Sequence, residues 1–133
     1  MSTNRYVMDS YAILAFFRHE AGWEWVRDAL RLAQGGGLEL HISAINMAEV
    51  QYCSLRRGSR GDDVLAALPS LPLHVASADE YIPRVVELKA KYPISLADCF
   101  AAALALALDC PLVTGDPEFH KLEGVLKIEW LGE

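Results

Sequence analysis

The stretch Arg5-Tyr-Val-Met-Asp-Ser-Tyr-Ala-Ile-Leu14 joins a short apolar strand to the start of a helix. We predict the strand over Arg5–Asp9 and the helix over Tyr11–Phe17, with Ser10 as N-cap because a serine hydroxyl accepts a free backbone N–H. Asp9 then lies at the carboxyl end of the strand, where open α/β sheets bind their ligands. An acid near a helix start is also favoured by the helix dipole alone, so Asp9 has a structural explanation beside the functional one.

The same alternation of strand and helix continues along the chain. Ser43 and Ser95 are predicted N-caps, and Ser77-Ala-Asp-Glu80 has the pattern of a capping box that opens a helix running to about residue 92. Short apolar strands alternating with helices indicate a mostly parallel central sheet of four to five short strands with helices on both faces, a three-layer α/β/α fold. The other predicted strands are 38–42, 73–75, 111–114 and, at the sheet edge, 127–130; the other helices are 23–34, 44–57, 61–68 and 95–108, the last apolar on nearly every side and expected to be buried.

Composition limits the classes of protein to consider. The chain has 133 residues, of which 53% are hydrophobic and 23% charged, so a single domain over 1–133 is expected. A net charge of −6 argues against a protein that coats nucleic acid by bulk charge. Residues 1–5 are polar and the apolar run 100–108 is short, so neither a secretory signal nor a membrane anchor is expected. The cysteines, in no metal-binding spacing, are expected to be free thiols in a reducing, cytoplasmic compartment; they are Cys53, Cys99 and Cys110.

Three further acids lie close to predicted element boundaries. Glu49 follows Ser43 by two helical turns and lies beside an apolar stripe, Asp98 is three residues after Ser95, and Asp116 lies in a Thr-Gly-Asp-Pro turn. Each has a structural alternative, as an exposed helical acid, a capping-box acid and a turn residue. The ends of parallel strands converge, so these acids and the acid of the first strand are expected to meet at one rim. Converging carboxylates repel one another, and oxygen ligands suit Mg²⁺ or Mn²⁺, so we predict a divalent-metal pocket.

Four segments resemble the motifs of PIN-domain nucleases, and most of all those of the VapC-type toxins of VapBC toxin–antitoxin systems. Their order and separations fit the family over nearly the whole chain; they are Val7-Met-Asp-Ser-Tyr-Ala-Ile-Leu14, Ser43-Ala-Ile-Asn-Met-Ala-Glu-Val50, Ser95-Leu-Ala-Asp-Cys-Phe-Ala-Ala-Ala103 and Leu112-Val-Thr-Gly-Asp-Pro-Glu-Phe119. The resemblance implies an endoribonuclease with one or two Mg²⁺ or Mn²⁺ ions, about 4 Å apart if two, that activate water against a scissile phosphate. The implied metal ligands and catalytic residues are Asp9, Glu49, Asp98 and Asp116.

Further residues are assigned through the same resemblance. Thr114 matches a family position that supports the site by hydrogen bonding. Ser10 and Asn46 lie next to matched positions and are candidates for orienting the carboxylates. Tyr11 departs from the family, which usually has a small polar pair after the first acid. The resemblance also implies an RNA substrate, a cognate antitoxin protein and a homodimer.

Two groups of residues outside the motifs are candidates for partner contacts. Arg56, Arg57 and Arg60 form a local basic cluster that can contact RNA phosphates, with a solvated helix end as the alternative. Four aromatic residues are candidates for an antitoxin groove, with the hydrophobic core as the alternative; they are Phe16, Phe17, Trp23 and Trp25.

Other functions are compatible with parts of the same sequence. A housekeeping PIN-domain RNase without an antitoxin and a non-catalytic PIN-like protein-binding module both fit the same motifs. A phosphohydrolase of the haloacid-dehalogenase kind also has an acid after its first strand, but it needs a second acid two residues later, where this chain has Tyr11.

Overall fold

The centre of the molecule is a five-stranded sheet in which every strand is parallel to its neighbours. The computed structural model describes residues 4–132, and the sheet has the order β3-β2-β1-β4-β5. The predicted sheet is confirmed, including the terminal strand at its edge. The strands are β1 Arg5–Met8, β2 Glu39–Ser43, β3 His74–Ala76, β4 Leu112–Thr114 and β5 Ile128–Trp130.

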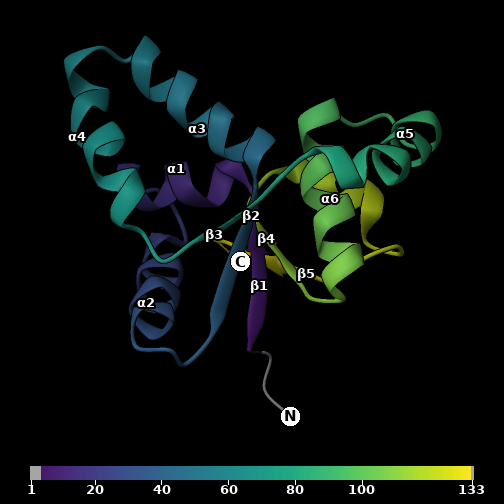
Figure 1. The fold of residues 1–133 in the computed structure, drawn as a ribbon, viewed down its shortest axis with the longest axis horizontal. Coiled ribbons are helices and arrows are strands. Elements are labelled where there is room, and N and C mark those ends of the chain that lie inside the picture. Colours follow the sequence, from purple (N-terminus) through teal and green to yellow (C-terminus); the bar gives the residue numbers. More distant parts are fainter. Residues whose placement is uncertain (1–3, 133) are drawn as a thin grey trace.

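Helices cover both faces of this sheet, as the predicted three-layer fold requires. Figure 1 shows α1 to α4 on one side of the strands and α5 and α6 on the other. The α-helices are α1 Ser10–Arg18, α2 Trp23–Gln34, α3 Ala44–Arg56, α4 Ser59–Ala67, α5 Ile82–Lys91 and α6 Leu96–Leu108, and the short 3₁₀ helices are η1 Leu68–Ser70, η2 Asp79–Tyr81 and η3 Pro117–Leu122. Within residues 4–132, no helix combines the length and the apolar character needed to cross a membrane.

Two apolar clusters fill the space between the three layers. Successive side chains of a strand point to opposite faces, and β1 divides its residues accordingly. Val7 belongs to the cluster with α5 and α6, and Met8 belongs to the cluster with α1 and α2. The predicted burial of α6 is confirmed, because every residue from Cys99 to Ala105 is buried. The buried central strands therefore hold their carboxyl ends in fixed positions.

The start of α1 differs from the prediction. Asp9, not Ser10, is the N-cap, and its Oδ1 accepts a hydrogen bond of 2.8 Å from the backbone N–H of Ala12. Both residue types are strong N-caps, and the choice depends on where β1 ends. Because the strand ends at Met8, Asp9 takes the capping position and Ser10 becomes the first residue of the helix.

The capping box predicted at residues 77–80 is also wrong. Residues Asp79–Tyr81 form η2, and α5 begins only at Ile82, with no side-chain cap. Pro83 lies in the first turn of α5, where its fixed φ and missing N–H are tolerated. The proline therefore sets the start of this helix. The caps predicted at Ser43 and Ser95 are confirmed.

Candidate functional site

The sheet register brings the ends of β1, β2 and β4 together. Met8 is paired with Ile42 on one side and with Val113 on the other. The residue that follows each of these strand positions therefore lies at the carboxyl end of the sheet, which is the upper end of the strands in Figure 1. These neighbours are Asp9, Ser43 and Thr114. The predicted convergence at one rim thus has a structural basis in the pairing of three strands.

Asp9 is the most enclosed acid at this rim. Its side chain is buried, with the residue 2% exposed, and Oδ2 accepts a hydrogen bond of 2.5 Å from the hydroxyl of the fully buried Thr114. Burial raises the pKa of Asp9 to about 7, although the hydrogen bonds from Thr114 and Ala12 act in the opposite direction. The negative charges of Asp98 and Asp116 raise this pKa further. Asp9 is therefore a buried acid with other carboxylates nearby.

Glu49 reaches the rim from the second turn of α3. Its Oε1 accepts hydrogen bonds from the Ser10 hydroxyl at 2.8 Å and from Asn46 Nδ2 at 3.1 Å. Asn46 is fully buried, and the same Nδ2 donates to the carbonyl of Ala97, the residue before Asp98, at 3.2 Å. Asn46 therefore connects α3 to the first turn of α6 and fixes the position of Glu49. Among the described residues, Asn46 Oδ1 is buried without a hydrogen-bond partner.

Asp98 and Asp116 are the two acids whose charges act on Asp9. Asp98 is half-buried in the first turn of α6, and its backbone N–H donates to the capping hydroxyl of Ser95 at 3.1 Å. Burial raises the pKa of Asp98 to about 6, with further contributions from the charges of Asp116, Glu49 and Glu118. Repulsion therefore links Asp98 to acids on α3 and on the loop after β4.

The loop after β4 holds Asp116 through its backbone. The Asp116 N–H donates to the Thr114 hydroxyl at 3.0 Å, so this hydroxyl bridges Asp9 and Asp116. The Asp116 side chain caps η3 by accepting from the Glu118 N–H at 2.9 Å. The turn and the functional explanations of Asp116 are therefore compatible.

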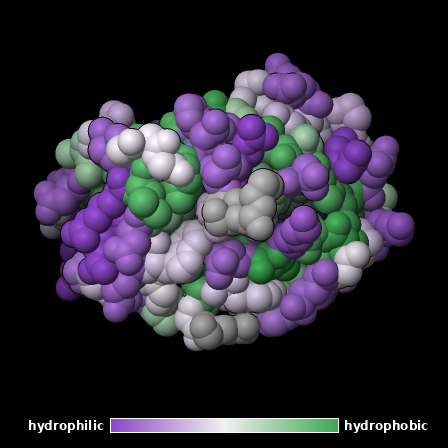
Figure 2. Space-filling view, turned by 90° about the horizontal axis from the view of Figure 1, so that it is seen from below, coloured by the Kyte–Doolittle hydropathy of each residue, from purple (hydrophilic) through white to green (hydrophobic). Residues whose placement is uncertain are grey.

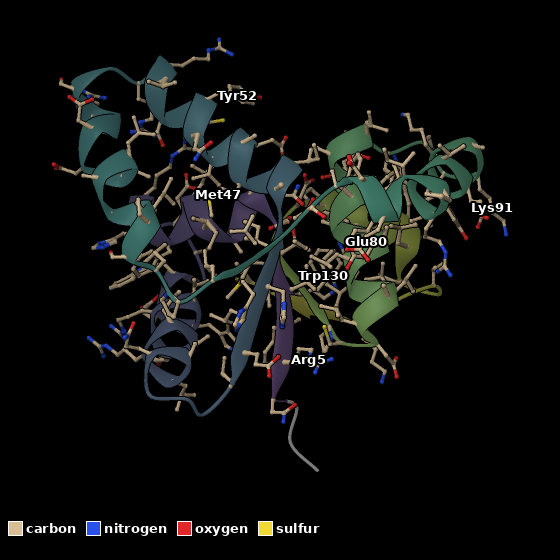
Figure 3. All side chains as sticks on the ribbon, in the orientation of Figure 1. Arg5, Met47, Tyr52, Glu80, Lys91 and Trp130 are labelled. Atoms are coloured by element: carbon tan, nitrogen blue, oxygen red, sulfur yellow. The ribbon has the colours of Figure 1, made fainter. Side chains whose placement is uncertain are left out.

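The four predicted acids thus belong to one neighbourhood, although their carboxylates do not form a ready-made cage. Figure 3 shows the surroundings, with Met47 and Tyr52 labelled on α3 across from α5 and α6. Within residues 4–132, no three His, Cys, Asp or Glu side chains are arranged to hold a metal ion as they stand. The roles of the acids, of Thr114, of Ser10 and of Asn46 stay predictions.

One cavity of the molecule lies away from this rim. A cavity of about 260 Å³ between the end of α6 and the segment before β5 is lined by Cys110, Val125 and neighbouring residues, and none of the four acids lines it. It lies toward the amino ends of the strands, the end seen in Figure 2, where hydrophilic and apolar residues alternate over the surface. This cavity is therefore separate from the candidate site.

One close contact at the rim was not predicted. The ring of Tyr11 packs directly on Gly115, between Thr114 and Asp116. The departure of Tyr11 from the family pattern was visible in the sequence. Its contact with Gly115 could not be predicted, because it depends on the pairing of β1 with β4. These strands are distant in sequence: Asp9 and Thr114, which share a hydrogen bond, are 105 residues apart.

The basic cluster lies away from the acids. Arg56 ends α3, Arg57 is its C-cap and Arg60 belongs to α4, and all three are exposed. Glu49 and Arg56 are seven residues apart on one helix, which is about 10 Å along its axis. The role of these arginines as phosphate contacts stays a prediction.

The four aromatic residues, candidates for either an antitoxin groove or the core, mostly pack against the core. Phe16, Phe17 and Trp25 are partly buried and pack against the cluster with α1 and α2. Trp23 is half-buried and stacks on His19 with ring centroids 4.0 Å apart. These contacts support the structural explanation of the aromatic residues.

Known proteins resemble this chain mainly in fold. The structure of VapBC2 from Rickettsia felis bound to a promoter DNA fragment has a TM-score of 0.70 and 22% identity, covering 96% of this chain and 98% of that one. The structure of DNA-bound VapBC from Salmonella typhimurium has a TM-score of 0.67 and 22% identity, covering 94% of this chain and 96% of that one. The structure of FitAcB from Neisseria gonorrhoeae has a TM-score of 0.68 and 18% identity, covering 92% of this chain and 95% of that one. No curated protein matches the sequence.

These structural matches show the fold, and a match to a family model shows the family. The model described as PIN domain matches residues 6–125, which include all four predicted acids. The match confirms the resemblance inferred from the four motifs. The chain therefore belongs to the PIN domain family.

Proposed function

We propose that this protein is a metal-dependent endoribonuclease and the toxin of a toxin–antitoxin pair. The observation that supports the proposal most is the position of Asp9, a buried acid whose neighbours at the rim include Asp98 and Asp116. Membership of the PIN domain family agrees with a nuclease, and solved structures with the same fold include toxin–antitoxin complexes.

The donor set fits Mg²⁺ or Mn²⁺. All four acids offer hard oxygen ligands, and the raised pKa values of Asp9 and Asp98 describe a place where negative charge lacks compensation. A divalent cation held by Asp9, Glu49, Asp98 and Asp116 supplies water activation and stabilisation of the leaving 3′ oxygen.

The chain's own residues orient these ligands. Thr114 holds one oxygen of Asp9 while Ala12 holds the other, and Ser10 and Asn46 together hold Oε1 of Glu49. Such supporting hydrogen bonds fix the direction of a ligand's lone pairs, and their loss typically costs about 10- to 100-fold in metal affinity or activity.

RNA cleavage with added Mg²⁺ or Mn²⁺ tests the proposal. We expect products with 5′-phosphate and 3′-hydroxyl ends, loss of cleavage in EDTA, and loss of cleavage in Asp9→Ala. Asp109→Asn is the matched control, because Asp109 lies at the opposite end of α6 and has φ 50°, a conformation that asparagine accepts. Cleavage that survives EDTA, or 2′,3′-cyclic phosphate ends, would rule out the proposed chemistry.

The basic cluster gives a separate prediction about RNA affinity. Replacing Arg56, Arg57 and Arg60 together by glutamine is expected to weaken RNA binding and to lower the slope of log affinity against log salt by about 2, at about 0.7 for each phosphate contact to a single strand. The comparison variant replaces Arg27 and Arg31 on α2. Unchanged affinity and unchanged salt slope in the triple variant would show that the cluster is only a solvated helix end.

The remaining parts of the proposal concern assembly and location. We propose a cognate antitoxin, a homodimer, a single domain over residues 1–133 and a cytoplasmic location, the last supported by three free cysteines among the described residues. Titration with Mn²⁺ separates the enzyme from a non-catalytic module, because a module would bind no metal at millimolar concentration. Cleavage by a chain that has no antitoxin partner would favour a housekeeping RNase.

A further inference from the structure

The ring of Tyr11 fills the space that a side chain on Gly115 would need. A Cβ placed on Gly115 would overlap Cε1 of the Tyr11 ring and lie 2.9 Å from Cζ and 3.1 Å from the hydroxyl oxygen. Gly115 has no positive φ, so its backbone conformation does not demand glycine. The contact with the ring does. The absence of a side chain at residue 115 lets Cε1 and Cζ of the ring approach the turn after β4 closely.

Both partners of this contact, Tyr11 and Gly115, belong to segments that hydrogen bonds hold in place. Tyr11 is the second residue of α1, whose start is fixed by Asp9 as N-cap. Gly115 lies between Thr114 and Asp116, which are themselves joined by a hydrogen bond of 3.0 Å. The ring therefore lies at the rim, next to two of the candidate metal ligands.

The ring is also open to solvent. Tyr11 is 37% exposed although most aromatic residues of α1 and α2 pack against the core. An aromatic surface that is fixed in place and partly exposed beside a cluster of acids contributes little to the core. It is well suited to contact a flat apolar group brought to the acids.

A nucleobase is such a group, and its contact with the ring would add affinity beside the metal's attraction for phosphate. The protein carries a net charge of −6, and the exposed arginines of α3 begin about 10 Å along the helix from Glu49. Close to the acids, the protein's own side chains therefore offer a polyanionic strand little charge attraction. Stacking of a base on an aromatic ring supplies affinity without charge and tolerates different bases.

We propose that Tyr11 stacks on a nucleobase next to the scissile phosphate of the bound RNA. The proposal rests on the proposed RNA cleavage. In A-form duplexes the bases are stacked on one another, whereas loops and single strands can present a base to an aromatic side chain. Tyr11 is thus a substrate-contacting residue, and an RNA duplex of the same sequence is expected to be a poor substrate.

The test pairs protein variants with RNAs that lack one base. An oligoribonucleotide with one cleavage site is made with an abasic nucleotide at each position around that site, and affinity in EDTA and KM with Mn²⁺ are measured. When the base is removed at one position flanking the cut, the wild-type protein is expected to bind the RNA about tenfold more weakly, within the range known for base–aromatic stacking. Tyr11→Leu is expected to show the same loss on intact RNA and no further loss on that abasic RNA, while Tyr11→Phe resembles wild type.

The Leu variant separates stacking from structure. Leucine keeps an apolar side chain against Gly115 but has no ring face, so unchanged thermal unfolding with altered KM supports stacking. Additive losses for Tyr11→Leu and the abasic RNA at every position would overturn the proposal even if the enzyme cuts RNA normally. Non-additive losses in EDTA without any cleavage would support the stacking and reject the nuclease. Absence of both RNA binding and cleavage would reject both.

Discussion

Asp9→Asn is expected to lower the rate of RNA cleavage by about 10³-fold or more while making the folded protein more stable at pH 8 in EDTA. The loss of activity follows from removing one charged metal ligand, which we set at about 4 kcal/mol of transition-state stabilisation, or about 10³-fold in rate. The gain in stability follows from removing a buried charge. These opposite effects distinguish a functional acid from a structural N-cap.

The size of the stability gain follows from the pKa of Asp9. A rise from 3.8 to about 7 makes the ionised form cost roughly 4 kcal/mol at pH 8, taken as an upper bound. Asparagine keeps an acceptor for the Ala12 N–H, but its amide is itself a buried polar group. We therefore expect a net gain of about 1–3 kcal/mol in the free energy of unfolding.

Urea denaturation at pH 8 in EDTA measures this gain, and a cleavage assay with Mn²⁺ measures the loss of activity. Asp109→Asn serves again as the control, because its side chain is remote from the rim and neither quantity is expected to change. A destabilised Asp9→Asn protein would mean that Asp9 is mainly a structural cap. A stabilised protein that still cleaves RNA would remove Asp9 from the catalytic residues.

The sequence predicted the carboxyl-end rim because strand and helix periods are local properties. Short apolar runs place Asp9 and Thr114 at strand ends, and the pairing of β1 with both β2 and β4 brings those ends together. The prediction failed where two local signals compete. Asp9 and Ser10 are equally good caps by residue type, and only the end of β1 at Met8 decides between them.

Contacts between distant segments were beyond sequence reasoning. The bond from Asn46 to the Ala97 carbonyl depends on how α3 meets α6, and a buried asparagine in a helix has no local signature that names its partner. Tyr11 and Gly115 are a similar case, since the need for glycine at residue 115 is understood only from its contact with the Tyr11 ring. In both cases a single local residue type has a meaning set by tertiary packing.

The wild-type protein in EDTA is expected to lose stability as the pH rises from 5 to 8. Asp9 binds its proton more tightly in the folded chain, where burial raises its pKa to about 7, than in the unfolded chain, where the pKa is 3.8. The contribution of the protonated acid is therefore complete below about pH 4 and is lost as the pH rises through 7. Asp98, with a pKa raised to about 6, changes stability in the same direction but less, because it is only half-buried.

A divalent cation should reverse this loss because it stabilises the ionised carboxylates. At pH 8, Mn²⁺ at 100 times its dissociation constant adds about 2.7 kcal/mol to the free energy of unfolding. The same concentration should add less at pH 5, where protons compete for Asp9 and weaken metal binding. Asp9→Asn should show a flatter pH profile and a smaller response to Mn²⁺. Unfolding curves at pH 5 and pH 8, with EDTA or Mn²⁺, measure all four conditions. Stability in EDTA that increases from pH 5 to pH 8 would contradict the raised pKa, and an equal Mn²⁺ response in both proteins would contradict Asp9 as a ligand.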